Sequence, residues 1–200
     1  MKKKKETKPE TSKKSKQLFP NFKRLRKIDL LAVIILVLLW STLTYFISLS
    51  DTTLTFMLSL ALTIAFMAFI ALLINRPGAI LIFSFLGALA TSDISNFGGL
   101  GWNKVIILTA AGLVFELISL LFTIEFKNIP LSVILGAGLS AASIPFTMFL
   151  LASGKKEIMP YVLNFSLTAL VLGTMTSVII FLIWYNIKNI KPIIRFEYHI

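Results

Sequence analysis

The sequence predicts an all-α integral membrane protein in which six transmembrane helices form one bundle and the third helix is short. Three observations lead to this fold class. The chain of 200 residues is 56% hydrophobic with a mean hydropathy of +0.86, more apolar than a soluble domain of this size can accommodate. Six apolar segments follow one another, most of them close to the ~20 residues that cross a bilayer. Positive charge is concentrated before the first of these segments.

The expected helices are apolar segments separated by short polar connections. Pro77, Pro130 and Pro160 stand at the starts of the third, fifth and sixth segments, where a missing N–H costs nothing. The third segment is only 14 residues long, so a re-entrant hairpin is the alternative to a full span. The predicted spans are residues 28–49, 54–74, 79–92, 105–124, 130–152 and 161–187.

The Lys and Arg residues between the spans indicate the topology. With six spans and a cytoplasmic N-terminus, five positive charges outside the N-terminal tail are cytoplasmic and three (Lys104, Lys155 and Lys156) are not, whereas a re-entrant third segment gives four on each side. The positive-inside rule therefore favours six spans, although Lys155 and Lys156 depart from it. We expect a multi-pass protein of the cell membrane with both termini cytoplasmic.

The charge pattern divides the chain into three parts. Residues 1–27 hold twelve of the twenty Lys and Arg residues against two Glu, a net charge of +10, and are expected to form a disordered cytoplasmic tail. This tail could bind anionic lipids or nucleic acid, or could only fix the topology; we favour the topology signal and expect no nucleic-acid partner. Residues 28–187 form the transmembrane domain, with the lipid bilayer as partner, and residues 188–200 a cytoplasmic C-terminal tail.

The composition excludes several kinds of chemistry. The chain has no Cys, and its only His is His199 beside the C-terminus, so thiol chemistry and an intramembrane histidine site are excluded. No nucleophile elbow, zinc-protease motif, nucleotide-binding loop or pair of intramembrane carboxylates is present. We therefore expect no enzyme activity, no cofactor and no metal site.

Glu116 is the one acidic residue deep within a predicted span. A charge there costs about 2.5–3.5 kcal/mol on insertion scales, so the side chain must face the interior and be paired or protonated. It belongs to a stripe of small and polar residues at helical spacing, with Thr109, Gly112 and Ser119, which favours an inward direction. Two roles stay open: a ligand contact or proton site, and a structural carboxyl hydrogen-bonded to a neighbouring Ser or Thr.

A second group of candidate residues lies at the expected outer ends of the helices. Aromatic rings beside amides and a carboxylate suit a flat, polar small molecule, although Trp102 and Tyr161 could instead only anchor the membrane interface. Gly98, Gly99 and Gly101 indicate a tightly turned or mobile loop, as a lid requires. The candidate substrate-binding residues are Asp93, Asn96, Trp102, Asn103, Tyr161 and Asn164, with Glu116 as the floor of the pocket.

One stretch carries a resemblance to a known family. Arg76-Pro77-Gly78 enters the short third helix, which contains Gly87; Phe97-Gly98 lies in the following loop, and Gly112 and Glu116 lie in the fourth helix. In these features, which cover residues 76–123, the chain resembles the substrate-binding S components of energy-coupling factor transporters. It looks most like the subfamily associated with hydroxymethylpyrimidine and thiamine uptake.

The resemblance implies a binder of a small heteroaromatic vitamin or vitamin precursor, with its pocket near the outer face. Such a subunit works with a transmembrane coupling subunit and two cytoplasmic ATPase subunits. One departure concerns the first helix, where Ala32 is followed by Leu36 instead of a second Ala, which puts docking to the coupling subunit in doubt. Metal-ion members use an N-terminal His that this chain lacks, which disfavours nickel or cobalt.

Two other classes of function remain open at this point. A polytopic scaffold or assembly protein would bind no solute, and its basic tail would be the working part. A stand-alone carrier of small solutes would be favoured by an inverted repeat, and none is convincing between residues 28–92 and 105–187.

Overall fold

A computed structural model of the protein describes residues 25–49, 52–94, 100–122, 125–126, 129–152 and 159–187. The predicted basic tail up to residue 24, Asn96, Gly98, Gly99 and the predicted C-terminal tail lie outside the described residues.

The described chain is a bundle of six α-helices, which confirms the predicted all-α membrane fold with a short third helix. Five helices are long and apolar enough to cross a membrane, so the chain is a multi-pass membrane protein. The third helix has 12 residues and rises about 18 Å, well short of ~30 Å of hydrocarbon. The helices are α1 (Lys27–Ile47), α2 (Thr53–Ile74), α3 (Ala79–Ala90), α4 (Trp102–Leu121), α5 (Leu131–Leu151) and α6 (Met159–Ile187).

The largest boundary difference from the sequence prediction is at α4, which begins at Trp102 and not at residue 105. The apolar pattern places the start too late because the first turn of the helix is polar, with Asn103 and Lys104 in it. Gly101, at φ 63°, makes the turn into the helix. Between α4 and α5, β1 (Glu125–Phe126) pairs antiparallel with β2 (Ile129–Pro130), a two-residue bridge that the sequence did not predict.

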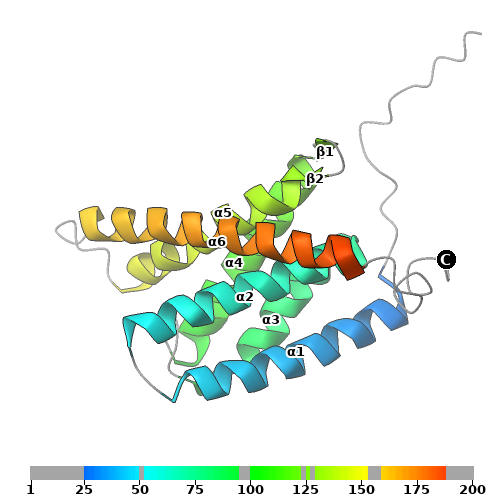
Figure 1. Ribbon diagram of the computed structural model, residues 1–200. Helices are drawn as coiled ribbons and strands as arrows, with labels where there is room; N and C mark the ends of the chain where they lie inside the picture. The colour runs from blue at the N-terminus through cyan, green and yellow to red at the C-terminus, as the bar shows by residue number, and fades with distance from the viewer. Residues whose placement is uncertain are drawn as a thin grey trace, which may run out of the picture.

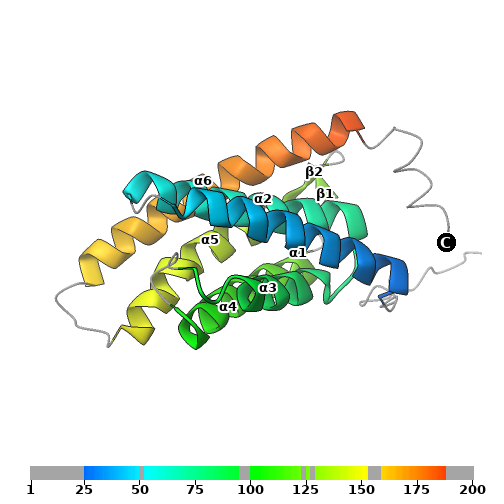
Figure 2. The ribbon, with the colours of Figure 1, turned by 90° about the horizontal axis from the view of Figure 1, so that it is seen from below.

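The six helices pack in two layers (Figures 1 and 2). One layer holds α1, α2 and α6, and the other holds α3, α4 and α5. Across the layers, α1 packs on α3, α6 packs on α5, and α2 contacts both α3 and α5. Within the second layer, α4 lies between α3 and α5 and packs against both. The shortest helix is therefore held by α4 on one side and by α1 and α2 on another.

Successive helices run in alternating directions, which gives the bundle two ends. We call the end where α1, α3 and α5 begin the proximal end, and the end where α2, α4 and α6 begin the distal end. The turn between α2 and α3 is therefore proximal, and the connection between α3 and α4 is distal.

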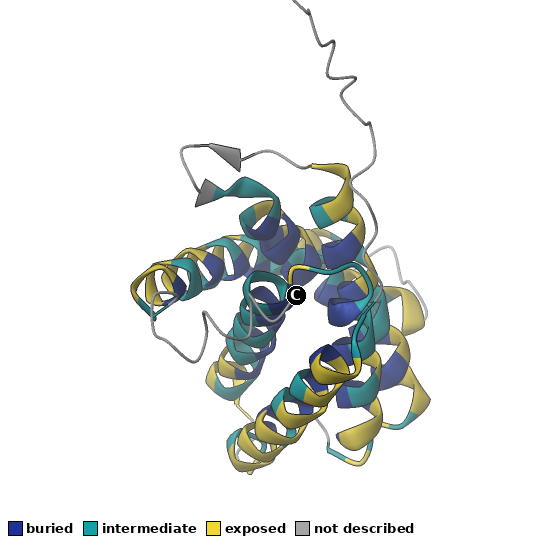
Figure 3. Ribbon diagram, turned by 90° about the vertical axis from the view of Figure 1, so that its right-hand side faces the viewer, coloured by how far each residue is buried: buried dark blue, intermediate teal, exposed yellow. Residues whose placement is uncertain are grey.

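The outward sides of the helices are apolar and exposed, as a lipid-facing surface requires (Figure 3). In α1, Leu31, Ile35 and Leu38 are each more than half exposed, and in α6 the same is true of Leu167 and Ile179. Such side chains would be a liability in water and are the expected surface in lipid.

An aromatic cluster fills the interior between α1, α2 and α3. The indole of Trp40 lies edge-on to Phe83, which in turn stacks on Phe66. The indole N–H of Trp40 donates to the Thr63 hydroxyl at 3.2 Å, so the buried ring leaves no polar atom unpaired. A Cβ on Gly87 would meet this indole at 2.9 Å, so the glycine sets how closely α1 and α3 approach.

Small residues set the contacts among α4, α5 and α6. A Cβ on Gly173 of α6 would lie 2.8 Å from the Ala137 carbonyl oxygen of α5, and one on Gly136 would lie 3.1 Å from the Phe115 carbonyl oxygen of α4. The buried Ser140 hydroxyl donates to the Ala111 carbonyl at 2.8 Å. These close approaches and cross-helix hydrogen bonds are typical of packing inside a membrane.

Candidate functional site

The start of α3 is held by Glu116 of the neighbouring helix. The first N–H groups of a helix have no partner within it, and inside a membrane no water replaces that partner. The Glu116 carboxylate accepts hydrogen bonds from the backbone N–H of Gly78 and, at 3.0 Å, from that of Leu81. Gly78 takes φ 91° to turn the chain into the helix, a conformation that favours glycine. The carboxylate thus caps α3 from outside, and its charge is favourable beside the helix N-terminus.

The end of α3 is held by Lys104, which is fully buried. Its ammonium donates to the carbonyl oxygens of Thr91 at 2.6 Å and of Ile94 at 3.0 Å. Thr91 is the C-cap residue of α3, and its carbonyl also accepts the backbone N–H of Ile94 at 3.0 Å. The positive charge therefore lies at the C-terminal end of the helix, where it is favourable.

The two caps match the length of the helix that they hold. Lys104 and Glu116 are twelve residues apart on α4, and α3 has 12 residues. Because both helices rise 1.5 Å per residue and run antiparallel, the two charged side chains reach opposite ends of α3 at the same time. Gly112 lies between them, and a Cβ there would come within 2.6 Å of Ser84 Cβ, so the helices touch between the caps. We call this unit of α3 and α4 the capped hairpin.

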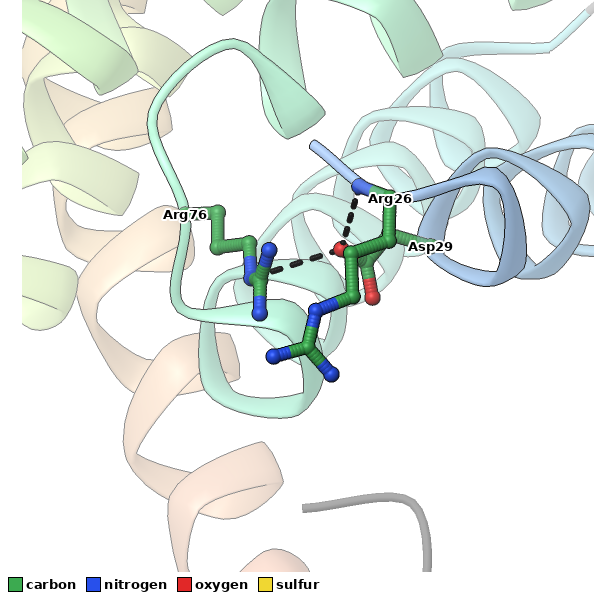
Figure 4. A network of polar contacts seen from close by, with 3 residues as sticks. All are labelled: Arg26, Asp29 and Arg76. Atoms are coloured by element: carbon green, nitrogen blue, oxygen red, sulfur yellow. Dashed lines mark hydrogen bonds and ion pairs between the residues drawn. The ribbon is translucent and has the colours of Figure 1, made fainter. Parts of the chain in front are cut away.

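An ion pair ties the proximal end of the capped hairpin to α1 (Figure 4). Arg76, in the turn before α3, lies with its Nε 3.3 Å from a carboxylate oxygen of Asp29. The same oxygen accepts the backbone N–H of Arg26 at 2.9 Å, at the start of α1. Both charged side chains are at least nine-tenths buried, so the pair fixes the α2–α3 turn against the first turn of α1.

The structure places five of the predicted site residues at the distal end. Asp93 follows α3, Trp102 and Asn103 form the first turn of α4, and Tyr161 and Asn164 lie in the first two turns of α6. All five are exposed, with 73% exposure for Trp102 and 76% for Tyr161. In the part of the chain that the structure describes, no hydrogen bond or ring contact joins the α4 residues to the α6 residues. Asn96 lies outside that part.

Glu116 does not join this group. It is 14 residues beyond Trp102 on the same helix, a rise of about 21 Å, and it lies at the proximal end of α3. The expectation that Glu116 forms the floor of a distal pocket therefore does not fit its position. The carboxylate does have the partner that its burial demands, in the form of backbone N–H groups.

Neither the role of Lys104 nor the ion pair between Asp29 and Arg76 was predicted from the sequence. Lys104 was counted as an external topology charge, yet its side chain is buried. The signal was the spacing: Lys104 and Glu116 are twelve residues apart, close to the length of the short third segment that precedes them. Nothing in the sequence alone pairs Asp29 with Arg76, because they are distant along the chain.

Among the described residues, no group of three or more His, Cys, Asp or Glu side chains could hold a metal ion. Comparison with protein-family models, with curated proteins and with solved structures finds no significant match to the chain.

Proposed function

We propose that the protein is a membrane-embedded small-molecule binding subunit of an importer of the energy-coupling factor type. The proposed ligand is a small heteroaromatic vitamin or vitamin precursor. The proposed location is the cell membrane, with the proximal end and both termini in the cytoplasm and the distal end outside. The transmembrane coupling subunit and two ATPase subunits are the proposed partners.

The observation that carries the proposal is the contact between the parts of the sequence that bear the resemblance. The Pro77-Gly78 turn and Glu116 are 38 residues apart, and they meet through the hydrogen bond from the Gly78 N–H. Gly112 lies against Ser84 of α3, and Gly87 lies against Trp40. The Pro77-Gly78 turn, Gly112 and Glu116 therefore meet along one pair of helices, and this contact is what supports the resemblance.

In this proposal the motif residues have structural roles in the capped hairpin, and the exposed residues at the distal end bind the ligand. In this proposal Glu116 braces the hairpin, and Asp93, Trp102, Asn103, Tyr161 and Asn164 contact the ligand, together with Asn96. Exposed aromatic and amide groups at one end of the bundle can stack on a flat ring and orient its polar atoms. This division differs from the sequence expectation only in the role of Glu116.

Mass spectrometry of the purified protein tests the proposal. We expect a heteroaromatic small molecule to be released in about equimolar amount when protein prepared in mild detergent is denatured. Protein with Trp102→Ala, expressed and purified in parallel, should release much less of it. If neither protein releases a small molecule and neither binds added thiamine or hydroxymethylpyrimidine, the proposed function is wrong.

Co-purification separates the proposal from its rivals. A binding subunit of this kind should be isolated with a second membrane protein and with nucleotide-binding subunits from its native membrane. A stand-alone carrier would retain a small molecule without such partners. A scaffold would bring protein partners and no small molecule.

A further inference from the structure

We propose that Lys104 is the positioning residue of the distal binding site, because its ammonium fixes the two sides of the α3–α4 connection relative to each other. The inference rests on the proposed function for its ligand. It concerns a residue that belongs neither to the resemblance nor to the predicted site.

Lys104 contacts two carbonyl groups on one side of the connection. Thr91 and Ile94 lie on the α3 side of the connection, and Asp93 lies between them. Both carbonyl oxygens accept from one ammonium group, so the backbone on either side of Asp93 is held at two points.

Lys104 lies beside the candidate ligand residues of α4. It directly follows Trp102 and Asn103, the two candidate ligand residues on α4. The Lys104 side chain is hydrogen-bonded to the α3 side of the connection, and its backbone belongs to α4. Lys104 therefore fixes the distance between Asp93 and the two residues Trp102 and Asn103. Beside Lys104, the backbone N–H of Gly101 donates a hydrogen bond to the Ser92 carbonyl at 2.9 Å, which joins the two ends of the connection.

Burying the Lys104 ammonium group has an energetic cost. A fully buried ammonium at a membrane-spanning helix is costly, and it is retained where it has partners. Capping α3 alone would need only a polar side chain near Thr91, since most helices end without a charged cap. The second hydrogen bond, to the carbonyl of Ile94, lies beyond the end of α3, so Lys104 also restrains the backbone of the connection.

The test compares Lys104→Met with Lys104→Arg, and uses Glu116→Gln at the other end of α3 as the matched control. Hydrogen exchange of the full-length protein in nanodiscs, read by mass spectrometry, follows two segments. Residues 92–101 report the distal connection, where the Ile94 and Gly101 N–H groups are hydrogen-bonded. Residues 78–82 report the proximal start of α3.

We expect Lys104→Met to speed exchange in residues 92–101 by about tenfold or more and to leave residues 78–82 unchanged. Glu116→Gln should show the reverse pattern. Lys104→Arg should recover most of the protection, since it keeps a positive donor. Equal exchange in residues 92–101 of wild type and Lys104→Met would overturn the inference, and so would faster exchange spread evenly over the whole protein.

The binding arm uses thiamine and hydroxymethylpyrimidine as probes. In folded protein, Lys104→Met should weaken binding of whichever probe the wild type takes by about tenfold, and Lys104→Arg should restore it. Unchanged affinity together with faster local exchange would show that Lys104 holds the turn but does not position the ligand, and would overturn the inference. Wild-type protein that binds neither probe and releases no small molecule on denaturation would contradict the proposed function, and the ligand-positioning role with it. The exchange pattern would still decide whether Lys104 holds the turn.

Discussion

Removing the Glu116 carboxylate tests the capped hairpin. Glu116→Ala leaves the N–H groups of Gly78 and Leu81 without their acceptor, in a region with little access to water. A buried donor left unpaired costs about 1–3 kcal/mol, and loss of a carboxylate beside a helix N-terminus adds about 0.3–1 kcal/mol. With two donors left unpaired, we expect Glu116→Ala to lower the free energy of unfolding by about 2–7 kcal/mol. Glu116→Gln keeps one acceptor oxygen and should cost about 1–2 kcal/mol.

The assay is reversible unfolding in mixed micelles, followed by circular dichroism. Asp93→Asn is the matched carboxylate-to-amide control, because Asp93 is exposed at the other end of α3; its effect should stay within about 0.5 kcal/mol. Should Glu116→Ala fail to fold, Glu116→Gln carries the test. A Glu116→Gln protein as stable as wild type would refute the view that the carboxylate caps α3.

Three further predictions concern packing, the proximal ion pair and topology. Gly112→Ala should destabilise the protein by about 1–3 kcal/mol because its Cβ would collide with Ser84, and adding Ser84→Gly should recover part of the loss; additive effects in a double-mutant cycle would contradict this contact. Asp29→Asn should cost about 1.5–3 kcal/mol by removing the charge that pairs with Arg76, and should speed hydrogen exchange in the α2–α3 turn; unchanged exchange there would speak against the tie. Because the chain has no native Cys, single Cys residues at Leu100 and Phe122 report the two ends of α4. A membrane-impermeant maleimide added to intact cells should label the first and not the second, and the opposite pattern would reverse the proposed orientation.

The fold was predictable from the sequence because a membrane imposes one strong rule. Every spanning segment must satisfy its backbone internally, so apolar length alone locates the helices. The boundaries are less predictable where a helix begins with polar residues: Trp102 and Asn103 were assigned to a loop, and they form the first turn of α4. The β1–β2 bridge escaped prediction because two-residue strands leave no periodic signal.

The candidate site was predictable in part. Alternation of six helices was enough to bring Asp93, Trp102 and Tyr161 to one end of the bundle. The hydrogen-bond partners of Glu116 were not predictable. A carboxylate deep in a span needs a donor, and the sequence does not say which group of the neighbouring helices supplies it. The hydroxyl groups of neighbouring Ser and Thr residues were the donors expected for Glu116, but its partners are backbone N–H groups of α3.

The separation of a distal binding end from a proximal brace is the central claim, and a calorimetric titration tests it most directly. Thiamine and hydroxymethylpyrimidine would be titrated into wild-type, Trp102→Ala and Glu116→Gln proteins, each checked to be folded. The claim predicts binding of one probe by the wild type, about tenfold weaker binding by Trp102→Ala through lost stacking, and unchanged affinity for Glu116→Gln. Weakened binding by Glu116→Gln with unchanged binding by Trp102→Ala would contradict it.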